Sequence, residues 1–319
     1  MNENFNNEKF KKMIADERFV KVNYDDIEEC RKKAEAGMPQ AQHMLAKAYH
    51  YGNGVEQCYK SAFEWYEKAA NQGIAASQNN LGLCYEFGYS IPKNNEIAFQ
   101  WYMKAAEQKF AISECNVARF YFKGFGVEKN YEKAFYWAEK AAPQGRVFSQ
   151  CILAQCYSVG LGITKNYGRA VHWYTKASEA GDSDAQNNLA ACYINANAPD
   201  YDQAVYWFNK SAEQGNADAQ NNLGWCYVNG KGVPQNYEKA FNWYQKAAEQ
   251  NHGAAQTDLG WLYEKGNGVP KNHKKAIYWY RKAKEQGNEL AKQKLKNYFN
   301  KCIAAMCFLL ALIVLVLFV

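Results

Sequence analysis

One helical pattern returns along this 319-residue chain at almost constant spacing. The pattern is Ala-x3-Leu-(Gly/Ala)-x2-Tyr or a close variant, and its copies are 36 residues apart except for one interval of 34. Its leucine position, called the repeat leucine below, falls at Leu45, Leu81, Val117, Leu153, Leu189, Leu223, Leu259 and Leu295. Periods of this length are typical of solenoids, in which each repeat buries its apolar face against its neighbours.

A second pattern follows each of the first seven copies, and residues 239–248 (KAFNWYQKAA) show it most clearly. Its tryptophan lies at Trp65, Trp101, Trp137, Trp173, Trp207, Trp243 and Trp279. In both patterns the apolar residues recur at intervals of three and four, as on one face of an amphipathic helix. The sequence therefore predicts an all-α solenoid built from pairs of antiparallel helices.

The residues between and beside the two helices predict how each pair is closed. Small residues follow the repeat leucine and would let the paired helices approach closely, as at Gly82, Ala118, Gly224 and Gly260. A Gly-x-Gly-Val type turn joins the helices, and its first glycine can end a helix in the left-handed conformation. Asparagines are placed to cap the second helix: Asn94, Asn130, Asn166, Asn236 and Asn272.

Together these motifs resemble the Sel-one-like repeat (SLR) family, whose 36-residue unit is related to the tetratricopeptide repeat. The resemblance covers about residues 24–300. It implies a tetratricopeptide-like, right-handed α/α superhelix of about seven helix-pair repeats that binds other proteins, often at membranes. The fifth repeat lacks two loop residues and the paired glycines, which predicts a local change of superhelical pitch near residue 197 and no domain break.

The period divides the chain into flanking segments and repeats. We expect a polar N-terminal segment (1–23), a degenerate capping helix (24–40), seven repeats (41–287), a basic capping and juxtamembrane helix (288–301) and an apolar tail (302–319). The repeats are 41–75, 76–111, 112–147, 148–183, 184–217, 218–253 and 254–287. The first segment contains no apolar run, so no signal peptide is expected.

Positive charge is concentrated in one part of the chain. The protein has 38 Lys and Arg against 32 Asp and Glu, a net charge of +6, but residues 271–301 hold ten basic and two acidic side chains. The rest of the chain is therefore close to neutral. This distribution argues against a nucleic-acid-binding protein, whose positive charge should follow a long groove or face.

No motif points to catalysis or to a metal ion. The histidines are dispersed, and no Cys-x2-Cys pair is present. We therefore expect no enzymatic activity, no cofactor and no metal site. Four cysteines share the slot three residues after the repeat leucine, where other repeats have Ala48 or Leu262, which predicts reduced thiols in the apolar core: Cys84, Cys156, Cys192 and Cys226.

The residue before the repeat leucine is a candidate peptide-binding position, because the resemblance implies that first helices line the concave face. In four repeats it is an asparagine: Asn80, Asn116, Asn188 and Asn222. An amide both donates and accepts hydrogen bonds, so such a ladder can hold an extended peptide backbone. The same side chains can instead bridge adjacent repeats, and the sequence leaves both interpretations open.

Further candidates for the concave face are Arg119, Lys123, Trp225 and Trp261. The two tryptophans lie outside the second-helix pattern, on equivalent slots 36 residues apart. They are expected either to stack as an exposed aromatic anchor for a partner or to pack between repeats.

Residues 302–319 (CIAAMCFLLALIVLVLFV) contain no charged side chain. As a helix this segment is roughly 27 Å long, close to the hydrocarbon thickness of a thin bilayer. We predict a single-pass tail anchor with the repeats facing the cytoplasm, since basic residues favour that side. Cys302 is a candidate for palmitoylation. The lysines before the segment are candidates for contact with anionic lipid: Lys292, Lys294, Lys296 and Lys301.

These predictions describe a non-enzymatic adaptor that binds a segment of a partner protein, of unknown identity, and holds it at a membrane. Two alternatives follow from the resemblance. One is a regulator or activator of a membrane enzyme, or itself a hydrolase, and the other is a subunit of a membrane-protein quality-control complex.

Overall fold

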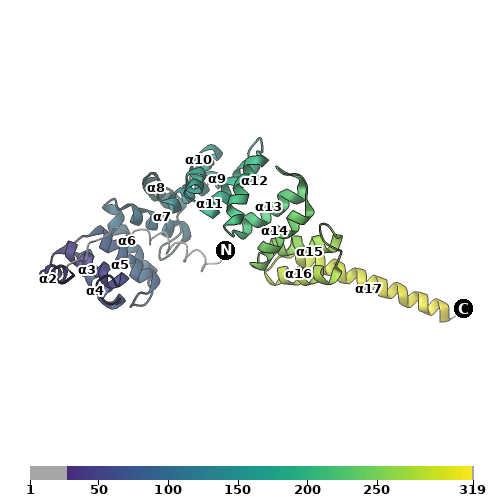
Figure 1. Ribbon diagram of the computed structural model, residues 1–319, viewed down its shortest axis with the longest axis horizontal. Coiled ribbons are helices and arrows are strands. Elements are labelled where there is room, and N and C mark those ends of the chain that lie inside the picture. The colour runs from purple at the N-terminus through teal and green to yellow at the C-terminus, as the bar shows by residue number, and fades with distance from the viewer. Residues whose placement is uncertain (1–26, 318–319) are drawn as a thin grey trace. The chain divides into compact units, whose positions relative to one another are not determined.

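The computed structural model describes residues 27–317, apart from the side chains of residues 301, 302, 305 and 307–317. Within this range the protein is all-α, with sixteen α-helices, one short 3-10 helix and no strand. Figure 1 shows the helices following one another as pairs. The predicted all-α solenoid of seven repeats is confirmed.

Each repeat contains a first and a second helix, flanked at the ends of the series by α2 (Ile27–Glu35) and α17 (Glu289–Leu317). The first helices are α3 (Pro39–Tyr51), α5 (Ala75–Phe87), α7 (Ala111–Lys123), α9 (Val147–Val159), α11 (Ser183–Ile194), α13 (Ala217–Asn229) and α15 (Gly253–Lys265). The second helices are α4 (Tyr59–Asn71), α6 (Asn95–Glu107), α8 (Tyr131–Ala141), α10 (Tyr167–Glu179), α12 (Tyr201–Glu213), α14 (Tyr237–Glu249) and α16 (His273–Glu285).

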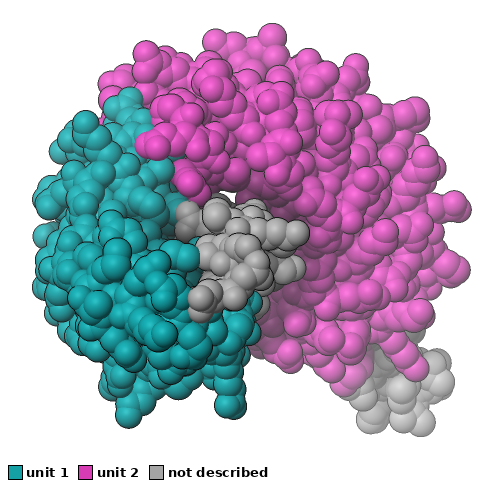
Figure 2. All heavy atoms as spheres, turned by 60° about the vertical axis from the view of Figure 1, so that its left-hand side comes forward, with its two compact units in different colours: residues 1–141 teal, residues 142–319 magenta. Residues whose placement is uncertain are grey.

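The chain forms two compact units, residues 1–141 and 142–319 (Figure 2). Unit 1 contains α2 to α8, and unit 2 begins with the 3-10 helix η2 (Ala142–Gln144) and continues from α9 to α17. The division follows α8, which has 11 residues where the other second helices have 13. Pro143 lies in η2 and cannot donate the backbone hydrogen bond that would continue an α-helix.

The repeat leucines form the centre of the packing between paired helices. Their side chains are almost completely buried, from 0% exposed at Leu45 to 6% at Leu295. Where the next residue is glycine, an added Cβ atom would lie 2.7 Å from a tyrosine ring of the second helix, at Gly82 beside Tyr102, Gly224 beside Tyr244 and Gly260 beside Tyr280. The predicted close approach of the paired helices is therefore confirmed.

The turn between paired helices has the predicted caps. Six first helices end at a glycine in the left-handed conformation: Gly52, Gly88, Gly124, Gly160, Gly230 and Gly266. The side chains of all five predicted asparagines accept a hydrogen bond from the backbone N–H three residues later. In the fifth repeat Asn195 has a φ of −90° in place of the left-handed glycine, and Asp200 caps the second helix.

The second glycine of the turn allows contact between consecutive repeats. At Gly232 an added Cβ atom would lie 2.3 Å from the backbone oxygen of Tyr201, in the preceding repeat. At Gly268 it would lie 2.4 Å from the backbone carbon of Tyr237. A side chain cannot be accommodated at such distances, so each of these turns rests directly on the start of an earlier second helix.

A row of buried glutamines, which was not predicted, joins six of the seven repeats to the element before them, and the third repeat has Glu114 in this position. We call it the glutamine seam: Gln42, Gln78, Gln150, Gln186, Gln220 and Gln256. Each Nε2 donates at 3.1 Å to a backbone carbonyl at the end of the preceding element, on Ala34, Ala70, Ala142, Ser178, Ala212 and Ala248. Carbonyls in the last turn of a helix have no partner within that helix, so the glutamine amide satisfies them.

Four members of the seam also accept a hydrogen bond from a glutamine that ends the second helix of the same repeat. The donors are Gln72, Gln108, Gln214 and Gln250, at 2.7–2.9 Å. Each such glutamine therefore links three helices: its own, the second helix of its repeat and the element before it.

The four cysteines of the shared slot lie in the core, as predicted. Burial raises the pKa of Cys84 and of Cys156 to about 12, and that of Cys192 and of Cys226 to about 11. All four are free thiols. Because the thiolate is the reactive form, these side chains are inert packing groups.

Replacing one glutamine of the seam should lower stability. In Gln220→Met, the buried Ala212 carbonyl loses its partner, which costs about 1–3 kcal/mol for a group left unsatisfied, while the exposed Gln250 amide can turn to water. Urea unfolding followed by circular dichroism measures the change. The matched control is Gln293→Met on the exposed side of α17, where a change within about 0.5 kcal/mol is expected. Equal effects of the two substitutions would refute the role of the seam.

Candidate functional site

The predicted binding residues lie on the first helices, and they differ widely in accessibility. We call the positions just before, two after and six after the repeat leucine the first-helix face. Asn116 and Arg119 are buried there, with 1% and 4% of their surface exposed. Asn80, Asn188, Asn222 and Trp261 are partly exposed, and Lys123 and Trp225 are exposed.

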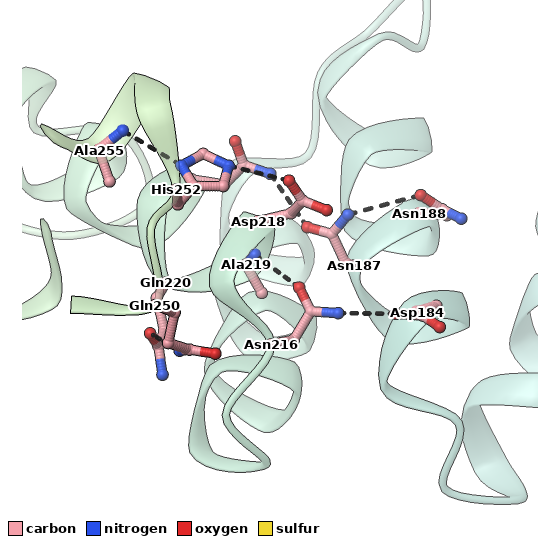
Figure 3. Close-up of polar contacts among 11 residues, drawn as sticks. Asp184, Asn187, Asn188, Asn216, Asp218, Ala219, Gln220, Gln250, His252 and Ala255 are labelled. Carbon is pink, nitrogen blue, oxygen red and sulfur yellow. Dashed lines mark hydrogen bonds and ion pairs between the residues drawn. The ribbon is translucent and has the colours of Figure 1, made fainter. Parts of the chain in front are cut away.

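Two of the four predicted asparagines, Asn116 and Asn222, bridge consecutive repeats. In unit 1, Asn116 Nδ2 donates to Asn79 Oδ1 at 3.0 Å. In unit 2, Asn222 Nδ2 donates to Asn187 Oδ1 at the same distance, and Asn187 Nδ2 lies 3.4 Å from Asn188 Oδ1 (Figure 3). The bridging role that the sequence left open is thus present at Asn116 and Asn222, whereas Asn188 contacts only its neighbour in α11. Contact with a peptide remains a prediction, and the burial of Asn116 leaves that side chain out of reach.

Arg119 was expected on the concave face, but its side chain is enclosed. Its two terminal nitrogens donate to the two carboxylate oxygens of Glu86 at 2.8 and 2.7 Å, and Tyr102 Oη donates to Glu86 at 2.8 Å. Burial, the nearby Glu86 and its hydrogen bond raise the pKa of Tyr102 well above its usual range. The three side chains fix α5, α6 and α7 against one another, so Arg119 acts inside unit 1.

The two tryptophans do not stack on each other in the part of the chain that the structure describes. The ring of Trp261 lies 6.5 Å from that of Tyr237, between centroids. Trp225 is 39% exposed, whereas Trp137 and Trp207 on second helices are each 9% exposed. Of the two interpretations, exposure therefore applies to Trp225 and packing to Trp261.

A second set of polar contacts joins the starts of the first helices in unit 2 and was not predicted. Asn216 Nδ2 donates to Asp184 at 2.8 Å, and His252 Nε2 lies 3.0 Å from Asp218 (Figure 3). The hydrogen bond to His252 lowers the pKa of Asp218. The sequence contains a signal for these contacts. Asp184 and Asp218 each lie two residues after the N-cap of a first helix, and 32 and 34 residues before their partners Asn216 and His252.

The basic segment before the tail lies on α17. Lys292 and Lys296 are exposed, and Lys294 Nζ is 4.0 Å from Glu264. The backbone of α17 is described as far as Leu317, but the side chains of Lys301, of Cys302 and of most of the predicted anchor are not among the described ones. Among the helices that could be assessed, none combines the length and the apolar character needed to cross a membrane.

The described residues include no group of three or more His, Cys, Asp or Glu side chains arranged to hold a metal ion. The polar groups on the first-helix face instead form pairs across consecutive helices. Such an arrangement, with amides, carboxylates and one exposed indole along a row of helices, suits contact with another polypeptide.

Arg119 and Lys123 lie one helical turn apart on α7, and their substitution should change the free energy of unfolding by different amounts. Arg119→Met leaves the Glu86 carboxylate buried without its cation, which should lower the free energy of unfolding by about 3–5 kcal/mol. Lys123→Met, at an exposed position, should change it by no more than about 0.5 kcal/mol. Chemical denaturation of both variants tests this, and similar midpoints would contradict the structural role of Arg119.

Known proteins resemble this chain in sequence and fold. A family model described as Sel1 repeat matches residues 39–74, 75–110, 111–145, 147–182, 183–216, 217–252 and 253–288. The crystal structure of a protective antigen present in uropathogenic Escherichia coli strains, which displays an SLR fold, is 33% identical with a TM-score of 0.74. The match covers 86% of this chain and 60% of that protein.

A Sel1 repeat protein from Oxalobacter formigenes is 32% identical with a TM-score of 0.66, covering 85% of this chain and 79% of that one. Among curated proteins there is no match. No catalytic family is indicated. The family match covers most of the chain, and the repeat boundaries coincide with the helix pairs described above. The chain therefore belongs to the Sel1 repeat family.

Proposed function

We propose that this protein is an interaction scaffold that binds a segment of a partner protein on the first-helix face of unit 2, next to a membrane. Sel1 repeat proteins are generally non-enzymatic scaffolds, which supports the general class. The observation that carries the proposal for this chain is the exposed indole of Trp225 on α13. Tryptophan is one of the residue types enriched among the side chains that contribute most to binding at protein interfaces.

The surroundings of Trp225 support the same conclusion. Asn222 lies one helical turn before it on α13, and the partly exposed Trp261 occupies the equivalent position on α15. Asn229 Nδ2 donates to the Trp225 backbone carbonyl at 2.8 Å, one turn later. A partner segment lying across α13 and α15 would bury the indole and find amide groups on both sides of it.

The membrane part of the proposal rests on α17 and the residues that continue it. Phe299, Ile303 and Met306 are 53%, 58% and 62% exposed, so the apolar character of the helix begins where it leaves the contact with α16. The uncharged segment 302–319 follows, and lysines precede it. We propose that this helix anchors the protein in a bilayer, with the repeats on the cytoplasmic side.

Substitution of the exposed indole should weaken partner binding without unfolding the protein. A photo-crosslinking amino acid at Asn229 would report the partner, and Trp225→Ala should reduce the crosslinked product about tenfold or more, as for an interface hot spot. The control is Tyr206→Ala on α12, which removes a comparably exposed aromatic from a second helix. Equal crosslinking in both variants would argue against the first-helix face.

Deletion of residues 302–319 should move the protein from the membrane fraction to the supernatant. The comparison variant keeps the apolar segment and carries Lys292→Gln and Lys296→Gln, and it should remain in the pellet after carbonate extraction. The proposal fails if the deleted chain still sediments with membranes after that treatment.

A further inference from the structure

The last helix runs without interruption from the solenoid into the proposed anchor. α17 extends from Glu289 to Leu317 as one α-helix, and its sequence contains neither glycine nor proline. Figure 1 shows it projecting beyond α15 and α16. Sharp bends in helices occur mainly at proline, glycine or irregular turns, so a continuous helix of this composition is a stiff rod. A bilayer that holds the apolar segment therefore also fixes the height of the last repeat above its surface.

The contacts between α16 and α17, which run in opposite directions, give that height. At the start of α16, the ring of His273 lies 5.5 Å from that of Tyr298, between centroids. At its end, the Ala283 carbonyl accepts a hydrogen bond from the Asn288 N–H at 3.0 Å. The start of α16 is thus level with Tyr298, which lies about 6 Å along the helix before Cys302, where the uncharged segment begins.

The end of α16 lies much farther from the uncharged segment. From His273 to Glu285 the helix rises about 18 Å. At physiological ionic strength, interactions between exposed charges decay over a Debye length of about 8 Å. The two ends of this one helix therefore differ by about two Debye lengths in their distance from the proposed membrane surface.

Basic side chains gather at the start of α16. They belong to the end of α15, the turn of the seventh repeat and the first turn of α16, and we call them the near lysines. All four are exposed: Lys265, Lys271, Lys274 and Lys275. Lys265 occupies in α15 the position that Lys301 has in α17, directly before the anchor. None of the four forms an ion pair with a residue that the structure describes.

The acidic residues beside the near lysines have other basic neighbours. Glu264 accepts a hydrogen bond from Tyr280 Oη at 2.7 Å and lies 4.0 Å from Lys294 Nζ. Glu238, at the start of α14 next to the turn of the seventh repeat, is followed directly by Lys239. The charge of the near lysines is therefore left uncompensated at the end of α16 that is level with Tyr298.

The opposite end of α16 carries a more balanced charge. Its basic residues share the region with the exposed carboxylates of Glu285 and Glu289, and Glu289 pairs with Lys292 at 3.2 Å. These basic residues are Arg281, Lys282 and Lys284. Distance and charge balance thus both single out the near lysines.

We infer that the near lysines bind the anionic headgroups of the bilayer that holds α17. Clusters of lysine next to a membrane segment are attracted to acidic phospholipids, and the attraction is lost beyond a Debye length. The stiff helix already holds these four side chains at the surface, so binding requires no further ordering of the backbone. The inference rests on the membrane part of the proposed function and deepens it, because it names the lipid class and the end of the last repeat that faces the bilayer.

The same geometry revises the lipid-binding candidates on α17. Lys292 lies about 15 Å along the helix before Cys302 and is therefore outside the range of the surface charge. The ion pair of Lys294 with Glu264 directs that charge toward α15. The near lysines of the seventh repeat, which precede α17 in the sequence, replace these two residues.

The test measures the accessibility of each lysine on the full chain in lipid nanodiscs. One set of discs contains phosphatidylcholine alone, and the other contains phosphatidylcholine mixed with phosphatidylserine. Reductive methylation, whose reagents are uncharged, labels accessible amines, and mass spectrometry gives the rate at each position. Lys284 and Lys292 are matched controls within the same molecule, because both are exposed and lie at the opposite end of α16.

We expect the near lysines to be methylated about fivefold more slowly in the phosphatidylserine discs than in the neutral ones. The difference should disappear in 1 M salt, where the Debye length is about 3 Å. Lys284 and Lys292 should be methylated at the same rate in both kinds of disc. Equal rates at the near lysines in the two lipids, or equal slowing at both ends of α16, overturns the inference while the anchor stands. A chain that enters neither kind of disc contradicts the anchor as well.

Discussion

The whole structure depends on a buried side-chain amide that donates to the end of another helix. A helix pair of this size cannot bury its apolar surface alone, so each repeat needs a neighbour placed at a definite distance and angle. Apolar contacts such as those of Leu223 give the attraction but little direction. The hydrogen bond from Gln220 to the Ala212 carbonyl fixes both, because a misplaced repeat would leave the amide and the carbonyl buried and unpaired.

On this frame the junctions between repeats fall into two kinds. Most use a glutamine of the seam, which is neutral, and two of the junctions also have an asparagine bridge. At the junction between α5 and α7, Glu114 stands in place of the seam glutamine, and the buried pair of Glu86 and Arg119 crosses the junction. A protein that binds others needs such exceptions, since a uniform solenoid would present every partner with the same surface.

Much of the fold follows from the sequence because its signals are local. The spacing of Leu189, Leu223 and Leu259, the capping asparagines and the turn glycines act within a few residues of their own position. The site was harder to predict because its contacts join residues 33 to 37 positions apart, as Glu86 and Arg119 do. From the sequence alone, a basic residue such as Arg119 on a first helix suggests an exposed groove, because the acidic residue that pairs with it in the fold is not evident. Polar glutamines likewise suggest solvent contact, although here they are buried.

The choice of a backbone carbonyl as the acceptor in the glutamine seam has an evolutionary consequence. A glutamine that binds the main chain does not require any particular side chain in the preceding repeat. A duplicated or deleted repeat can therefore form acceptable junctions at once, without a compensating change next door. The junction of Glu86 and Arg119 lacks this freedom, because either residue alone would be a buried charge. Change in repeat number should thus be tolerated at the neutral junctions and resisted at that one.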